Sequence, residues 1–98
     1  MEFQEVNMIK FADYKAPGKK LIRLKVDIDK NIIKSCQING DFFIFPIEGQ
    51  EILEKTLENK PLNIEIIGNT LEKALKDNNI EILGIEIKDI LEAFKKVF

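Results

Sequence analysis

Apolar and charged residues alternate strictly from residue 22 to residue 28, directly after Leu21. The apolar members are Ile22, Leu24, Val26 and Ile28. A period of two predicts a strand with one buried and one solvent-facing side. Residues 6–14 predict a strand before it, and residues 32–38 predict one after it. The inward positions of the last strand are Ile32, Cys36 and Ile38. We expect an antiparallel meander in the order 1-2-3.

Two short segments connect the predicted strands. Ala16-Pro17-Gly18-Lys19 fits a type II turn, because proline presets the negative φ of the second position and glycine accepts the positive φ of the third. Asp29-Lys30-Asn31 is a short polar connection between the second and third strands. The resulting sheet has one apolar face, which needs a covering layer.

Helical spacing replaces alternation after Pro46. Proline suits the first turn of a helix, so we expect a helix to begin there and to end before Pro61. Its apolar stripe consists of Ile47, Leu53 and Leu57. Asn63 is placed to cap a second helix that stops at Asn78, and residues 80–85 form an apolar connector to a third. The apolar sets of these two helices are Ile64, Ile67, Leu71, Ala74 and Leu75, then Ile87, Ile90, Leu91, Phe94 and Val97.

Length and composition fit this architecture. A chain of 98 residues, 45% hydrophobic and 33% charged, fits one domain over residues 1–98. The elements predict an α+β fold of two layers, in which about three helices cover one face of the meander. No apolar stretch approaches the roughly 20 residues of a membrane span, and the N-terminus lacks an apolar signal region. We therefore expect a cytoplasmic protein with no membrane partner.

Charge and residue types exclude several classes of function. Fifteen basic residues against seventeen acidic ones give a net charge of -2, which offers no broad positive field for nucleic acid. The chain has no histidine and one cysteine, so it has neither an internal disulfide, nor a multi-thiolate metal site, nor a histidine-based triad. We expect no catalytic residue and no metal ligand. The glutamates of the first helix predict a solvated face: Glu48, Glu51, Glu54 and Glu58.

The segment from Gly40 to Pro46 joins the sheet to the helical layer. Gly40 permits the bend at the end of the third strand, and Asp41 can accept hydrogen bonds from nearby N–H groups. Phe42 and Phe43 are adjacent, so both cannot point inward where the chain is extended. We expect one of them, or Phe45, to face outward as an interface anchor.

Two ordered segments carry a resemblance to a known family. The first runs Lys15-Ala16-Pro17-Gly18-Lys19-Lys20-Leu21-Ile22, and the second runs Ile38-Asn39-Gly40-Asp41-Phe42-Phe43, followed by Pro46. In this order they resemble the accessory (C-terminal) domain of lipoate-protein ligase, which in many archaea is a separate small protein. The chain departs from the family pattern at Lys19, in place of a second glycine, and at Glu86, in place of a serine that follows Gly84-Ile85. The first departure should change surface charge more than shape, and the second should weaken a helix cap.

The resemblance implies a fold similar to the SufE/NifU-like scaffold and a role without catalysis by this chain alone. A separate catalytic subunit would bind lipoate, ATP and Mg²⁺, form lipoyl-adenylate with the help of this chain, and lipoylate a lysine of glycine cleavage H protein or an E2 subunit. The chain itself would bind no cofactor. The residues implied to face the partner or the adenylate are Lys15, Pro17, Gly18, Lys20, Gly40, Asp41, Phe42 and Phe43.

Two other functions stay open at the level of sequence. A sulfur-transfer or iron–sulfur assembly scaffold would use Cys36 as an exposed sulfur acceptor. However, the inward phase of Cys36 favours a core thiol, and a reactive thiolate needs exposure and nearby positive charge. A binding module for another acyltransferase or acyl-carrier domain would use the same surfaces with a different partner.

Overall fold

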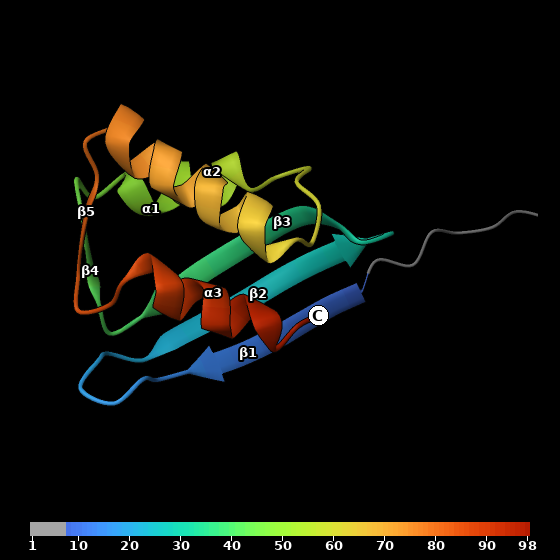
Figure 1. The fold of residues 1–98 in the computed structure, drawn as a ribbon, viewed down its shortest axis with the longest axis horizontal. Coiled ribbons are helices and arrows are strands. Elements are labelled where there is room, and N and C mark those ends of the chain that lie inside the picture. Colours follow the sequence, from blue (N-terminus) through green and yellow to red (C-terminus); the bar gives the residue numbers. More distant parts are fainter. Residues whose placement is uncertain (1–7) are drawn as a thin grey trace, which may run out of the picture.

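The computed structural model describes residues 8–98, and it begins with a three-stranded antiparallel sheet (Figure 1). The strands are β1 (Met8–Tyr14), β2 (Ile22–Asp29) and β3 (Ile32–Gly40), in the order β1-β2-β3. This confirms the predicted meander, although residues 6 and 7 of the expected first strand lie outside the described residues. The alternating positions of β2 face inward as predicted, with Ile22 and Val26 fully buried.

Both strand connections are tight turns. The Lys19 N–H donates to the Ala16 carbonyl oxygen at 3.0 Å, and Gly18 has a φ of 75°, as a type II turn requires. Lys30 and Asn31 have φ values of 53° and 62°. Two consecutive positive φ angles are typical of the type I′ turn, whose twist matches that of the strands it joins.

Three helices lie on one face of the sheet, and they confirm the two-layer α+β fold (Figure 1). They are α1 (Gly49–Thr56), α2 (Ile64–Asp77) and α3 (Ile87–Lys95). The helix α3 packs against β1 and β2, α1 packs against β3, and α2 contacts both other helices. The Asn63 side chain accepts a hydrogen bond from the Ile66 N–H at 3.0 Å, as its N-cap position predicts.

The core lies between the sheet and the helices. Its fully buried large side chains come from both layers, namely Ile22, Leu24, Val26, Ile33, Ile38, Leu53, Leu57, Ile67, Leu71, Ile90, Phe94 and Val97. Burying such side chains is the main favourable term in folding, at roughly 1.5–3 kcal/mol each before the entropy of ordering is subtracted. The predicted apolar stripes of α2 and α3 therefore define the packed interface.

A β-bulge corrects the predicted face of β3. Asp27 pairs with Ser35 but the next residue, Ile28, pairs with Ile33, so Lys34 is an extra residue in the ladder. The inserted residue brings Ile33 into the core, whereas Ile32 is only half-buried. The prediction that Ile32 shares the inward side with Cys36 was therefore wrong, because strict alternation does not hold across a bulge.

A second, two-stranded sheet was not predicted. The strand β4 (Phe43–Phe45) pairs antiparallel with β5 (Glu81–Leu83). The strand β5 lies inside residues 80–85, which the sequence predicts to be a connector. Figure 1 shows the two short strands together at one end of the molecule. Strands of three residues are too short for their alternation to stand out in a sequence.

The start of α1 also differs from the prediction. The chain stays extended through Phe45, the Pro46 carbonyl oxygen accepts a hydrogen bond from the Gly49 N–H at 2.8 Å, and the helix begins only at Gly49. Ile47 was expected on the apolar stripe with Leu53 and Leu57, but it lies in this turn with 88% of its surface exposed.

Three of the four glutamates predicted to form a solvated face are exposed, and Glu54 is the exception. Glu54 is half-buried, and its Oε2 accepts a hydrogen bond from the Ile38 N–H at 2.7 Å. The Gln50 side chain donates to the Ile38 carbonyl oxygen at 2.8 Å. Because β3 is an edge strand, these side chains satisfy backbone groups that would otherwise lack a partner. Glu51 is exposed as expected and pairs with Lys55 at 3.2 Å.

Candidate functional site

The two segments predicted to form a site contact each other at one end of the sheet. The Asp41 N–H donates to the Leu21 carbonyl oxygen at 3.0 Å, directly after the turn that contains Pro17 and Gly18. A Cβ atom on Gly40 would lie 2.0 Å from the Leu21 carbonyl oxygen and 2.8 Å from the Phe42 ring. Only a residue without a side chain fits there, which explains the glycine of the second segment.

A third segment joins this contact from the far end of the chain. The Lys20 N–H donates to the Gly84 carbonyl oxygen at 3.0 Å. The aliphatic stem of Lys20 and the Cβ of Phe42 both pack beside Gly84, where an added Cβ would lie 2.9 Å from the Lys20 Cγ and 3.4 Å from the Phe42 Cβ. Phe42 is half-buried against the core, so it supports this joint from within.

The lysines of the first segment stay accessible at this end. Lys15 and Lys20 are exposed, as are Pro17 and Gly18 at the hairpin tip. No ion pair holds either lysine among the residues that the structure describes. Their ammonium groups are therefore available to an anionic group on a partner.

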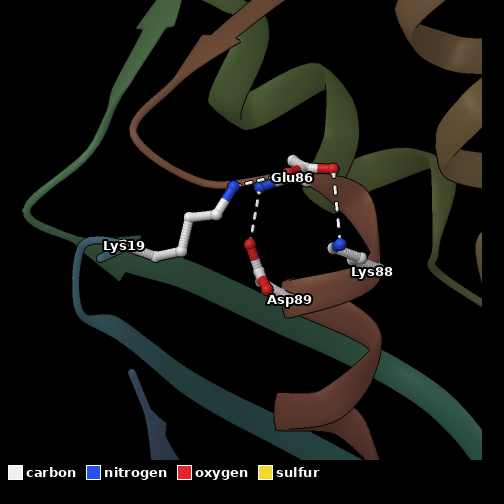
Figure 2. A network of polar contacts seen from close by, with 4 residues as sticks. All are labelled: Lys19, Glu86, Lys88 and Asp89. Atoms are coloured by element: carbon white, nitrogen blue, oxygen red, sulfur yellow. Dashed lines mark hydrogen bonds and ion pairs between the residues drawn. The ribbon is translucent and has the colours of Figure 1, made fainter. Parts of the chain in front are cut away.

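The two departures from the family pattern are partners of each other. Figure 2 shows the Lys19 ammonium bonded to the Glu86 carboxylate, with Lys88 at 3.9 Å from the other carboxylate oxygen. The hydrogen bond from Lys19 and its charge lower the pKa of Glu86, and the bond to Glu86 raises the pKa of Lys19. The pair ties the hairpin turn to the start of α3.

The start of α3 has a second fixed contact. The buried Asp89 carboxylate accepts a hydrogen bond from the Glu86 N–H at 2.9 Å (Figure 2). Such a bond satisfies one of the free N–H groups at a helix N-terminus, where negative charge is also favourable. Sequence reasoning expected a weakened cap here and missed Asp89, although its position three residues after Glu86 is the usual signal for this contact.

The aromatic residues of the joint divide between core and surface. Phe42 turns inward, whereas Phe43 and Phe45 on β4 are 66% and 50% exposed. This confirms that at least one phenylalanine faces outward. The Phe43 and Phe45 rings stack with 6.4 Å between their centres, and the exposed Leu83 of β5 pairs with Phe43. We call Phe43, Phe45, Leu83 and the exposed Ile47 the ladder patch.

Sequence reasoning missed the contributions of Leu83 and Ile47 to this surface. The sequence pattern predicts a connector at Leu83 and a buried helical stripe at Ile47. Phe43 and Ile47 line one hollow with Gly40 and Gln50. A usable signal was the spacing of Phe43 and Phe45, because residues two apart on a strand share a face.

Cys36 is a core thiol, as predicted. Its side chain is 7% exposed, its Sγ lies 3.8 Å from the Glu54 carbonyl oxygen, and burial raises its pKa to about 12. A sulfur acceptor must be an accessible thiolate. The structure therefore contradicts the exposed Cys36 that a sulfur-transfer scaffold requires.

Other classes of site find little support within residues 8–98. No group of three His, Cys, Asp or Glu side chains lies close enough there to hold a metal ion. None of the helices in that part of the chain has the length and apolar character needed to cross a membrane. The described surface instead includes a tightly fitted joint, accessible lysines and an exposed apolar patch, all on a small α+β domain.

Comparison with known proteins identifies the family of this domain. Residues 19–94 match the family of the bacterial lipoate protein ligase C-terminus, and the chain belongs to that family. It is 34% identical over 79 residues to lipoate-protein ligase A subunit 2 of Thermoplasma acidophilum, covering 81% of each chain. This result confirms the resemblance that the two motif segments indicated.

The fold is similar to that of a chain in the solved structure of an archaeal lipoylation system. That work describes a bipartite lipoate protein ligase and its E2 lipoyl domain from Thermoplasma acidophilum. The TM-score is 0.77 at 32% sequence identity, and the match covers 91% of this chain and 97% of the other.

Proposed function

We propose that this chain is the accessory subunit of a bipartite lipoate-protein ligase. A separate catalytic subunit requires it for the ATP-dependent activation of lipoate to lipoyl-adenylate and for the lipoylation of acceptor lysines. The observation that carries the proposal is its similarity, over 81% of both chains, to a relative that is itself named as subunit 2 of such a ligase. The match to a chain from a bipartite lipoylation system supports it.

Lipoate, ATP and Mg²⁺ belong to the catalytic subunit in this proposal. Lys15 and Lys20 face the phosphates of ATP or of the acyl-adenylate, because both are exposed at the end of the sheet where the motif segments meet. Pro17, Gly18 and Gly40 hold that end in shape, and Asp41 lies beside them on the partner-facing surface.

The proposed acceptors are lipoyl domains of E2 subunits and glycine cleavage H protein, reached through the complex. The E2 lipoyl domain is supported by the archaeal lipoylation system, because one chain of that solved structure has a fold similar to this one. H protein is proposed from the family resemblance alone, as another carrier protein with an acceptor lysine. The single domain over residues 1–98 and the cytoplasmic location also stay predictions.

Reconstitution tests the proposed function. The catalytic subunit is incubated with ATP, Mg²⁺ and lipoate, with and without this chain, and adenylate formation is followed by pyrophosphate release. Lipoylation of a separate E2 domain is read by its mass increase. We expect both signals to require this chain. Equal adenylate formation by the catalytic subunit alone would refute the accessory role, and binding to the acceptor domain without any effect on activation would favour an acyl-carrier binding module.

A further inference from the structure

We propose that the ladder patch is the surface on which the catalytic subunit docks, in an orientation that places Lys20 toward the nucleotide. This inference rests on the proposed function and adds to it the contact surface and the direction of docking. The partner surface should be apolar, with basic side chains opposite the end of the patch that contains Phe45.

The patch gathers exposed apolar side chains on one side of a single ladder. Phe43 and Leu83 pair across β4 and β5, so their side chains share a face, and the Phe45 ring stacks on Phe43. Ile47 extends the apolar surface from the adjoining turn. Single exposed apolar residues are ordinary, but clustered aromatic and aliphatic side chains are typical of interface centres.

The strands that carry the patch are packed against the core. Ile44 and Ile82 alternate with the outward residues on the same two strands and pack against the core, and α1 contacts β4. A surface fixed in this way loses little conformational entropy on binding.

Charge gives the patch a direction. Glu81 pairs with Phe45 across the ladder, so an acidic side chain lies at the Phe45 end. It is exposed, and no described basic side chain forms an ion pair with it.

The opposite end of the patch carries Lys20 together with the exposed Asp41, so it lacks the excess negative charge of the Phe45 end. Lys20 packs beside Gly84, which follows Leu83 directly. Complementary charges fix the orientation of two partners. A catalytic subunit with basic groups opposite Phe45 therefore has Lys20 at the other end of the contact, and in this proposal that end faces the nucleotide phosphates.

Binding of the purified catalytic subunit, measured by calorimetry, tests the apolar part of this surface. We expect Phe43→Ser and Phe45→Ser to weaken binding at least about tenfold each. The matched control is Phe11→Ser on β1, because Phe11 is 72% exposed but lies on another strand. Its binding should equal that of the wild type. Ile47→Ser, in an exposed turn, keeps the test valid if a β4 variant fails to fold.

A charge reversal tests the orientation. Glu81→Lys should weaken binding several-fold at low salt and less at high salt, whereas Glu72→Lys on the exposed side of α2 should not. Folded variants that bind like the wild type would overturn the surface proposal, and equal effects of the two charge reversals would overturn the orientation. The surface proposal also fails if Phe43→Ser abolishes a dimer of this chain but leaves binding of the catalytic subunit unchanged.

The wild-type protein separates this inference from the proposed function. If the wild type neither binds nor activates the catalytic subunit, the proposed function itself fails. If the wild type activates it and the ladder-patch variants activate it equally well, only the docking surface is wrong.

Discussion

Lys19 and Glu86 form an ion pair that joins the first hairpin turn to the start of α3. The two residues stand at the two positions where the chain departs from the family pattern. A lysine in the turn and a glutamate at the helix start compensate each other's charge at this contact. Neither departure is therefore explained by its own position alone.

This pair predicts a pH-dependent effect on stability. The pKa of Glu86 is lowered in the folded chain, so its contribution is present above the unfolded pKa and is lost as the pH falls through the folded value. We expect Glu86→Gln to lower the melting temperature slightly at neutral pH and to match the wild type in acid. Thermal melts across pH check this, with Glu72→Gln as the control. A Glu86→Gln effect of the same size in acid would contradict it.

Gly40 is predicted to be intolerant of any side chain. In Gly40→Ala the new methyl group would lie 2.0 Å from the Leu21 carbonyl oxygen, so the joint must open, and we expect a loss of more than about 3 kcal/mol. Gly18→Ala is the matched control, because Gly18 also has a positive φ but no atom within 4 Å of the added Cβ. It should cost about 1 kcal/mol. Urea unfolding measures both, and equal losses would show that steric fit at Gly40 is unimportant.

Glu54 is predicted to stabilise the edge of the sheet. Glu54→Leu removes the acceptor of the Ile38 N–H and should cost about 1–3 kcal/mol. Glu54→Gln keeps an oxygen acceptor and should cost less. Glu51→Leu, on the exposed side of the same helix, should change stability by less than about 1 kcal/mol. The interpretation fails if urea unfolding gives the same loss for the Glu54→Leu and Glu51→Leu variants.

Cys36 is predicted to be unreactive in the folded chain. Iodoacetamide should label it far more slowly in native conditions than in urea, because the thiol is buried and its pKa is about 12. The raised pKa also means that its contribution to stability is full below the usual value of 9.0 and falls as the pH rises toward about 12. The wild type should therefore lose more stability than Cys36→Ala in alkali. Rapid native labelling would contradict the buried position.

Lys20 is predicted to assist activation of lipoate. Lys20→Gln should lower adenylate formation in the reconstituted complex about tenfold, which corresponds to ~1.4 kcal/mol, without changing the melting temperature. Lys15→Gln should act in the same direction. Lys34→Gln is the control, because Lys34 is exposed on β3 at the bulge. An equal effect of all three substitutions would indicate loss of general positive charge, and no effect would remove both lysines from the site.

The sequence was sufficient to predict the strands and helices whose hydrophobic pattern extends over many residues. The alternation of β2 and the helical stripes of α2 and α3 extend over enough residues to be distinguished from chance, and the cap at Asn63 and the turn at Gly18 have a local physical signal. The family followed from two motif segments whose contact at Gly40 and Leu21 explains their residues.

The remaining features depend on contacts between distant segments. The β4–β5 ladder has only three residues a side, and its pairing is set by the packing of the helices between its strands. The bulge at Lys34 and the role of Glu54 follow from the partner strand and from α1, neither of which a local pattern contains. The Lys19–Glu86 pair likewise joins two residues that lie 67 positions apart in the sequence.

The strands of the ladder patch lie on either side of α1 and α2 in the sequence. The patch therefore exists only after both helices have packed, and an unfolded chain does not present it. A partner that binds there selects the native population and shifts the folding equilibrium by mass action, by about 2.7 kcal/mol at a free concentration 100 times its Kd. In a cell, the amount of folded accessory subunit would then depend on the supply of its catalytic partner.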